Sequence, residues 1–168
     1  MAVGNEAPFF AIRAGDFVSL LEGPVAAEEY DQAEGRSVNH HGFPRFSSAS
    51  FSAAYPFGRV SLDDPASPVS VELVGFNPLI PGDSEASSLP VAALMYRVTN
   101  KTGAPVEVSI AGALRNFVGC DGTRRRNTWY GEPLVPDGAC SNRNAAVEAD
   151  GLRGVLMTSD GVDRKDAA

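Results

Sequence analysis

The chain is poor in the residues that most often bind metals. It contains two histidines and two cysteines in 168 residues. The histidines are adjacent, His40 and His41, whereas Cys120 and Cys140 lie far apart in the sequence, an arrangement that does not match a zinc site. We therefore expect no metal and no cofactor. A disulfide between the cysteines and a pair of free thiols both stay open, and free thiols are favoured because no export signal is visible.

Basic residues and long apolar runs are also scarce. Fourteen Lys and Arg stand against 21 Asp and Glu, for a formal net charge of -7, so the overall field repels a nucleic-acid backbone. The longest nearly uninterrupted apolar run, Pro90 to Tyr96, is far shorter than the ~20 residues that cross a bilayer. Met1 to Gly15 has neither a basic start nor a long apolar centre. We expect a soluble, cytoplasmic chain without nucleic-acid partner, transmembrane segment or signal peptide, provided that Met1 is the natural start.

Almost no segment keeps an apolar helical stripe for three turns, and short β-type segments alternate with Gly, Pro, Asn and Asp. Seven or eight short strands of this kind predict an all-β fold, namely a two-sheet antiparallel β-sandwich, and the length suits a single domain over 1–168. The expected strands are Phe9 to Arg13, Phe17 to Leu21, Phe43 to Phe51, Arg59 to Leu62, Val69 to Phe76, Leu89 to Thr99, Val106 to Leu114 and Leu152 to Thr158.

The sequence predicts how two pairs of strands are connected, one by a hairpin and one by a crossover between the sheets. Residues 92–114 resemble a hairpin, because two alternating segments flank a turn rich in Asn, Lys, Thr, Gly and Pro. In its first strand Leu94, Tyr96 and Val98 should be buried on one face, with Met95 partly covered on the other. The stretch from Phe76 to Leu89 is broken by prolines and predicts a crossover from one sheet to the other.

Two regions are less regular. Glu22 to Arg36 is compatible with a helical turn or a solvated loop, and the sequence does not decide between them. Gly119 to Asn144 predicts a long loop over the sandwich. It contains the one cluster that mixes cations with aromatic rings, Arg124 to Arg126 with Trp129 and Tyr130, which suits either a solvated cover of the core or a docking or ligand-binding surface.

No group of residues forms a recognisable catalytic constellation. Carboxylates are plentiful, but each cluster is flanked by turn-forming or small polar residues, where a carboxylate is usually solvated or a turn residue. His40 and His41 have no nucleophile in a recognisable elbow. We therefore predict no catalytic residue, and the substrate-binding residues stay unknown. The carboxylate clusters are Glu28 with Glu29, Asp63 with Asp64, and Asp83 to Glu85.

Residues 55–119 resemble the N-terminal domain of glycoside hydrolase family 116, the family of bile-acid-type β-glucosidases and non-lysosomal glucosylceramidases. Weaker similarity extends to Phe9 to Gly15 and to Gly154 to Gly161. The residues that carry the resemblance are, in order, Tyr55-Pro56-Phe57, Asp64-Pro65, Phe76-Asn77-Pro78 with Ile80-Pro81, Ser87-Ser88-Leu89-Pro90-Val91, Val98-Thr99-Asn100, and Arg115-Asn116 with Gly119.

The resemblance implies a β-sandwich followed by a larger α/α barrel that holds the catalytic nucleophile and the acid/base of a retaining β-glycosidase. That barrel is absent from this chain, and the sandwich is expected to be incomplete at both ends. The leading hypothesis is a non-catalytic fragment of the N-terminal domain, inactive alone, whose partner is the barrel of the same protein; carbohydrate or glycolipid would bind through that barrel. The alternative is an independent carbohydrate-binding or adhesion module, and a free-standing enzyme is disfavoured.

Overall fold

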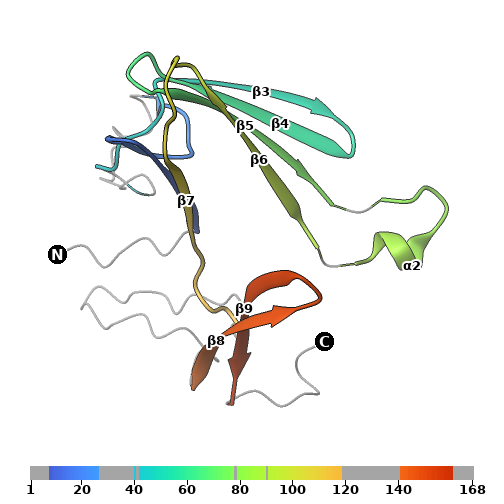
Figure 1. The fold of residues 1–168 in the computed structure, drawn as a ribbon. Coiled ribbons are helices and arrows are strands. Elements are labelled where there is room, and N and C mark those ends of the chain that lie inside the picture. Colours follow the sequence, from blue (N-terminus) through green and yellow to red (C-terminus); the bar gives the residue numbers. More distant parts are fainter. Residues whose placement is uncertain are drawn as a thin grey trace, which may run out of the picture. The chain divides into compact units, whose positions relative to one another are not determined.

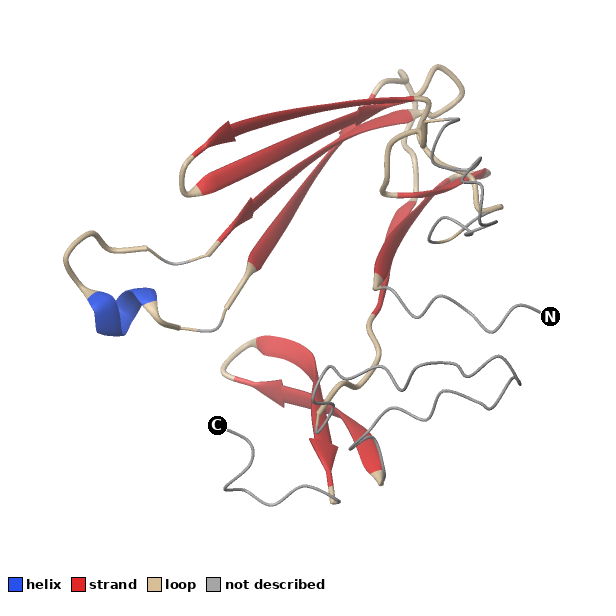
Figure 2. Ribbon diagram, turned by 180° about the vertical axis from the view of Figure 1, so that it is seen from behind, coloured by secondary structure: helices blue, strands red, loops and turns tan. Residues whose placement is uncertain are grey.

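The computed structural model describes residues 8–26, 40, 42–77, 79–89, 91–118 and 141–160. The chain forms two compact units, Met1–Ala113 and Leu114–Ala168. Within the described residues nearly all regular structure is antiparallel β-strand, with one helical turn, α2 (Ser84–Ser87). The all-β, sandwich-like prediction is confirmed (Figures 1 and 2).

The first unit contains two antiparallel sheets. The smaller sheet has the order β2-β1-β7 and the larger has the order β3-β4-β5-β6 (Figure 1). The strands are β1 (Phe9–Ala14), β2 (Phe17–Leu20), β3 (Ser48–Ala54), β4 (Phe57–Asp63), β5 (Val69–Phe76), β6 (Ala93–Asn100) and β7 (Val108–Ala113).

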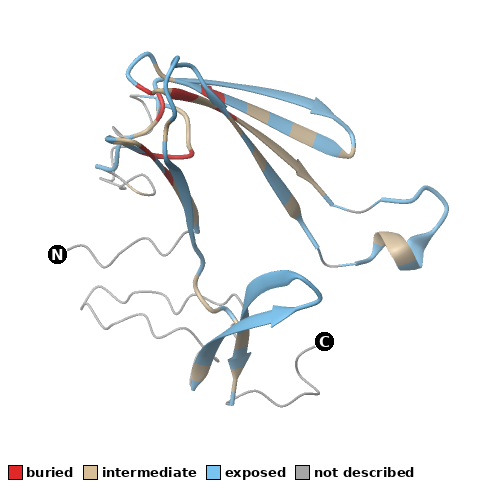
Figure 3. Cartoon of the chain, in the orientation of Figure 1, coloured by how far each residue is buried: buried red, intermediate tan, exposed pale blue. Residues whose placement is uncertain are grey.

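The core lies where the two sheets face each other at one end of the larger sheet (Figure 3). Ile12 of the smaller sheet packs in one buried cluster with Leu62 and Val71 of the larger sheet. In the larger sheet Leu62 is opposite Val71, which is opposite Val98. Because successive side chains of a strand point to opposite faces of the sheet, these three apolar side chains share the face that packs on the core. Phe46, which precedes β3, is fully buried in the same cluster.

The predicted crossover at Phe76 to Leu89 is wrong. β5 and β6 are neighbours in one sheet and pair over their whole length, from Val69 opposite Asn100 to Phe76 opposite Ala93. The prolines do not prevent this pairing because they lie in the connection, outside the paired residues, where a missing amide hydrogen removes no ladder bond.

The predicted hairpin over 92–114 is also wrong, because this is where the chain changes sheets. β6 pairs with β5, whereas β7 pairs with β1, from Phe9 opposite Ala113 to Ala14 opposite Val108. The Lys101 amide donates to Pro68 O (2.9 Å) beside the larger sheet, and the Gly15 amide donates to Glu107 O (3.0 Å) beside the smaller one. The residues between these two anchors form the passage from the larger sheet to the smaller one.

Burial along β6 is less than the sequence predicts. Tyr96 and Val98 pack against the core, and the Tyr96 ring lies 5.6 Å from that of Phe10. Leu94 and Met95, in contrast, are about half exposed. The core cluster covers only one end of the larger sheet, so the same apolar alternation continues onto an uncovered surface.

The observed strand boundaries differ most from the predicted ones where irregular backbone precedes the strand. The predicted strand from Phe43 to Phe51 begins only at Ser48, because the Phe46 amide donates to Glu22 O (3.1 Å) in place of a ladder partner. The predicted strand from Leu89 likewise begins at Ala93.

The second unit is built on a hairpin of β8 (Asn142–Ala149) and β9 (Leu152–Ser159). β9 confirms the strand expected at Leu152 to Thr158, whereas β8 was not predicted, because its sequence is rich in Asn and Ala and has little β-type alternation. Asn116 holds the open end of this hairpin: its Nδ2 donates to Arg143 O (3.0 Å) and Thr158 O (3.2 Å).

We expect Asn116→Asp to loosen the hairpin. The variant loses the donated bonds but keeps an oxygen that accepts from the Val118 amide. Losing about 1–2 kcal/mol of local stability should accelerate amide exchange in β8 and β9 roughly 5- to 30-fold. Hydrogen exchange read by mass spectrometry checks this, with β4 as the internal control. Unchanged exchange in the hairpin would contradict the role given to Asn116.

Asp64 closes the turn between β4 and β5. Its Oδ1 accepts from the Ala66 amide (2.8 Å) and its Oδ2 from the Ser47 amide (3.0 Å). The hydrogen bond from Ala66 is the main cause that lowers the pKa of Asp64 below its ordinary value of 3.8. Desolvation opposes it, and Ser47 and Lys101 act in the same direction as Ala66.

Because the pKa of Asp64 is lower in the folded state than in the unfolded state, its ionised carboxylate stabilises the fold at pH values above the unfolded-state pKa. This stabilisation is lost as the pH falls through the folded-state pKa. We therefore expect the free energy of unfolding to decrease as the pH is lowered below 3.8. The decrease should be less steep in Asp64→Asn. Urea titrations between neutral pH and pH 2 measure the difference. Parallel pH profiles for the two proteins would show that the turn does not bind the ionised carboxylate preferentially.

Candidate interaction surface

Of the described candidates for catalytic residues, Asp63, Asp64, Asp83 and His40 make contacts within the fold, and Glu85 lies in the first turn of α2. Asp63 Oδ1 accepts from Lys101 Nζ (2.9 Å), and Asp64 closes its turn. Asp83 caps α2, its Oδ1 accepting from the Ala86 amide (2.9 Å). His40 Nδ1 lies 3.0 Å from Glu22 Oε1. Outside the described residues lie Glu28, Glu29, His41, Cys120, Cys140 and the cluster of Arg124 to Arg126 with Trp129 and Tyr130.

Neither metal clusters nor membrane-spanning helices are found in the described part of the chain. No group of three or more His, Cys, Asp or Glu side chains there is placed to hold a metal ion. Among the same residues, no helix has the length and apolar character needed to cross a membrane.

Sequence reasoning missed one ionic cluster. Glu22 accepts from Arg45, with Oε2 2.9 Å from Nη2, as well as contacting His40. The Arg45 and His40 side chains are buried, and the Glu22 side chain is partly exposed. The cluster connects His40 and Arg45 to the end of β2. In the sequence, the only sign of it is that an acidic residue, Glu22, follows the apolar strand.

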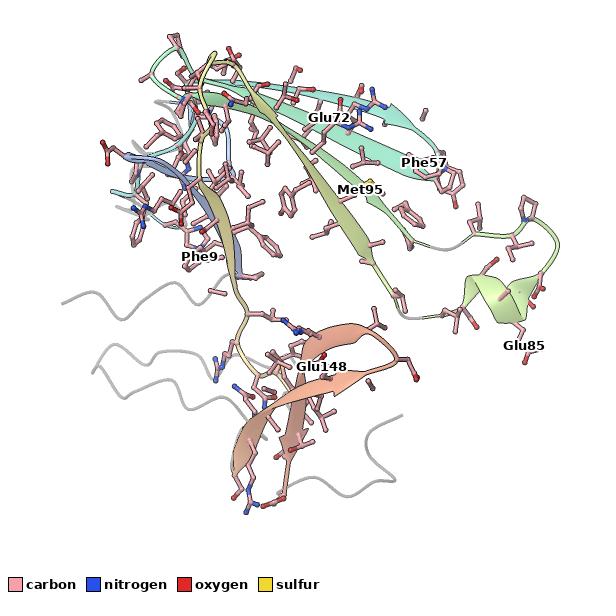
Figure 4. The ribbon with its side chains drawn as sticks, viewed as in Figure 1. Phe9, Phe57, Glu72, Glu85, Met95 and Glu148 are labelled. Carbon is pink, nitrogen blue, oxygen red and sulfur yellow. The ribbon has the colours of Figure 1, made fainter. Side chains whose placement is uncertain are left out.

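Several exposed apolar side chains lie in the two connections at the end of the larger sheet opposite the core. The β3–β4 turn and the β5–β6 loop both leave the sheet at this end, because Phe57 pairs with Phe76, which pairs with Ala93. Figure 4 shows Phe57 at the β4 side of this end and Glu85 on the loop helix. We call six of these side chains the distal patch: Tyr55, Phe57, Leu79, Ile80, Leu89 and Val91.

The β5–β6 loop closes on itself through its own polar groups. The Ile80 amide donates to Ser87 Oγ (3.0 Å), and that hydroxyl donates to Ile80 O (3.1 Å). The Asp83 amide donates to Ile80 O (3.0 Å), and the Ser88 hydroxyl to Glu85 O (2.8 Å). The loop therefore satisfies much of its own backbone and leaves apolar side chains on its surface.

The outer face of the larger sheet carries an ionic cluster beside two aromatic rings. Glu72 contacts Arg97 (Oε1 to Nη1, 3.2 Å) and Arg59 (Oε2 to Nη1, 3.6 Å). The rings of Phe57 and Phe76 are 5.5 Å apart and inclined at 49°. All the side chains of the ionic cluster reach solvent, so the ion pairs add little to stability.

The family model described as beta-glucosidase 2, glycosyl-hydrolase family 116 N-term, matches residues 16–168. The chain belongs to glycoside hydrolase family 116. Comparison with curated proteins gives no match. The family-116 match covers described strands of both compact units, and the resemblance seen in residues 55–119 is confirmed.

The described family-116 residues fall into three structural groups. Asp64 and Asn100 form turns at the core end, where the Asn100 Oδ1 accepts from the Thr102 amide (2.8 Å). The second group lies in the β3–β4 turn and the β5–β6 loop and supplies five of the six side chains of the distal patch, all but Leu79. The third group follows β7, where Asn116 Nδ2 donates to Arg143 O (3.0 Å).

Proposed function

We propose that this chain is a non-catalytic part of the N-terminal domain of a β-glucosidase-type hydrolase, and that it supports the catalytic barrel of the same protein. The observation that carries the proposal is the combination of the family-116 N-terminal match with an exposed apolar end on the first unit. Large exposed apolar patches are typical of protein interfaces. The match across both units supports treating 1–168 as one domain segment.

The chemistry in this proposal belongs to the barrel. A retaining β-glycosidase uses two carboxylates about 5–5.5 Å apart, whereas Asp64 closes a turn, Asp83 caps a helix and Glu72 pairs with cations. The glucosylceramide class of substrate would likewise be selected by the barrel. A cytoplasmic location stays a prediction of the sequence, which cell fractionation tests.

The supporting role is tested in the joined polypeptide, by which we mean this chain continuous with a family-116 catalytic domain. Removing residues 1–168 should lower the temperature at which β-glucosidase activity is irreversibly lost by several degrees, because the barrel loses a packed neighbour. Equal inactivation temperatures with and without these residues would overturn the proposal.

The chain alone should hydrolyse no aryl β-glucoside above background. Acid/base and nucleophilic groups lower the barrier of this reaction, and Asp63, Asp64 and Asp83 are instead engaged in hydrogen bonds within the fold. Release of nitrophenol is followed at high protein concentration, with Asp63→Asn and Asp64→Asn as controls for contamination. Turnover that follows the protein and disappears in either variant would contradict the assignment.

A second candidate function is carbohydrate binding by the outer face, favoured by the exposed Phe57 beside the Arg59–Glu72–Arg97 cluster. Rings and guanidinium groups can contact sugars. The inclination of 49° between Phe57 and Phe76 prevents the two rings from forming one flat platform. Affinity electrophoresis in soluble β-glucan separates the functions: retardation that Phe57→Ala abolishes would favour a binding module.

A further inference from the structure

The larger sheet ends on one side at β3 (Ser48–Ala54), and this edge is open in the described part of the chain. Among the described strands β3 pairs with β4 alone, and no backbone hydrogen bond from the described residues reaches its other side (Figure 1). All seven of its residues are exposed. An open edge presents a row of amide and carbonyl groups to which another extended strand can bind.

The edge of β3 lacks the features by which proteins usually protect such edges. Charged side chains, prolines and bulges discourage pairing with other chains. β3 contains no charged residue and no proline, and its register with β4 is unbroken. The opposite edge of the same sheet, β6, carries Arg97. Along β2, an edge of the smaller sheet, the Leu20 amide already donates to Pro44 O (2.8 Å).

The sequence of β3 reads the same in both directions about Phe51. Ser50 and Ser52 flank this ring, and Ala49 and Ala53 follow on either side. Two copies of β3 placed antiparallel about a two-fold axis at Phe51 therefore set serine opposite serine, alanine opposite alanine and ring opposite ring. Pairs of aromatic rings and pairs of hydroxyl side chains both stabilise neighbouring strands.

β7 (Val108–Ala113) is a second uncharged edge, and it lacks this symmetry. Val108 and Ile110 lie toward one end of the strand, and Ala and Gly fill the other. A two-fold pair of β7 strands would set the bulky side chains opposite small ones and cover little of their surface. The mirrored sequence therefore singles out β3.

The position of the core leaves room for a pair of β3 strands. Ala49 lies in one row with Leu62 and Val71, at the end of the larger sheet on which the smaller sheet packs. In an antiparallel pair this end of one copy lies beside Ala53 of the other copy. The two smaller sheets then sit at opposite ends of the joined sheet and do not collide.

We propose that β3 is the surface through which this chain forms a homodimer, in which β3 pairs antiparallel with β3 of a second copy about Phe51. The two four-stranded sheets become one continuous sheet. Backbone hydrogen bonds supply the attraction. Phe51, the only large side chain of the strand and 70% exposed, supplies the apolar contact and fixes the register. This inference does not depend on the supporting role proposed above.

Charge substitutions at Phe51 test the edge and the register together. Sedimentation velocity should find the chain as a dimer. Phe51→Lys and Phe51→Glu should each raise the dissociation constant at least about tenfold, because the ring pair is lost and like charges face each other across the axis. An equimolar mixture of the two variants should recover the dimer, because unlike charges then lie opposite each other.

Met95→Lys is the matched control, since Met95 is 58% exposed and lies on β6, the other edge of the same sheet. It should leave the dimer unchanged. A monomeric wild-type chain would refute the proposal, and so would a dimer that persists in both Phe51 variants. Dissociation by Met95→Lys alone would place the contact on β6, and a mixture that stays monomeric would refute the register about Phe51; either result overturns the proposal.

The dimer contact adds to the free energy of unfolding only where the dimer is populated. Unfolding measured at protein concentrations below the dissociation constant therefore reports the stability of the single chain, including that of variants at Phe51.

Discussion

Phe46→Ala is expected to lower the free energy of unfolding of the first unit by about 3–5 kcal/mol, the usual cost of truncating a buried phenylalanine. Phe46 is fully buried, packs in the cluster that joins the two sheets, and lies 5.5 Å from the ring of Phe17. Because a domain is stabilised by only ~5–15 kcal/mol in total, the variant should unfold at much lower denaturant concentration.

The same substitution at Phe51 is the control. Phe51 is 70% exposed on β3, so its removal should cost about 1 kcal/mol or less. Leu94→Ala should fall in the same low range, because Leu94 is about half exposed. Urea titrations followed by circular dichroism give all three values. Equal losses for Phe46 and Phe51 would mean that the core has been placed in the wrong part of the sandwich.

Gly23→Ala is expected to cost about 1–3 kcal/mol, the range for overpacking a tight contact. A Cβ added at Gly23 would lie 2.4 Å from the Cβ of Ala49, which is a short side chain that cannot rotate away. The backbone after β2 must therefore move off β3, and the nearby Glu22 O to Phe46 amide bond would be disturbed.

A double-mutant cycle isolates this contact. Ala49→Gly in the Gly23→Ala background should restore a large part of the lost stability, because it removes the atom that clashes. Gly103→Ala is the neutral control, since no heavy atom lies within 4 Å of a Cβ added there. Additive effects of the two substitutions, with no recovery in the double variant, would contradict the close approach of Gly23 to Ala49.

The sequence predicted the strands well wherever apolar alternation was strong. Val69–Phe76 was predicted with its bounds, and β1 and β2 each differ by one residue at their C-terminal ends. Periodicity reports which residues form a strand and which face is apolar, but the pairing partner depends on contacts far along the chain. For this reason the two connections were assigned the wrong way round: the prolines marked a loop within one sheet, and the passage between sheets followed Asn100.

The candidate surface was harder to predict than the fold. Leu94 belongs to the same alternating row as Tyr96 and Val98, yet it is about half exposed because the buried cluster ends before it. No local sequence pattern distinguishes an apolar side chain that is buried in the core from one that lies on an exposed surface of the same strand. The hydrogen bonds between Ser87 and Ile80 could not be predicted from the sequence either. Serine is common in solvated loops, and its partner here is a backbone group, which every residue has.

Hydrogen exchange in the β5–β6 loop tests the central claim, that this chain is a docked support and not an independent module. Amides of residues 79–89 are compared in the chain alone and in the joined polypeptide, with β2 (Phe17–Leu20) as the reference segment. A supporting contact at the exposed apolar end of the first unit predicts about tenfold slower exchange of the loop in the joined polypeptide, the slowing that 1.4 kcal/mol of added local stability gives, with no change in β2. Identical loop exchange in the two proteins would contradict the claim.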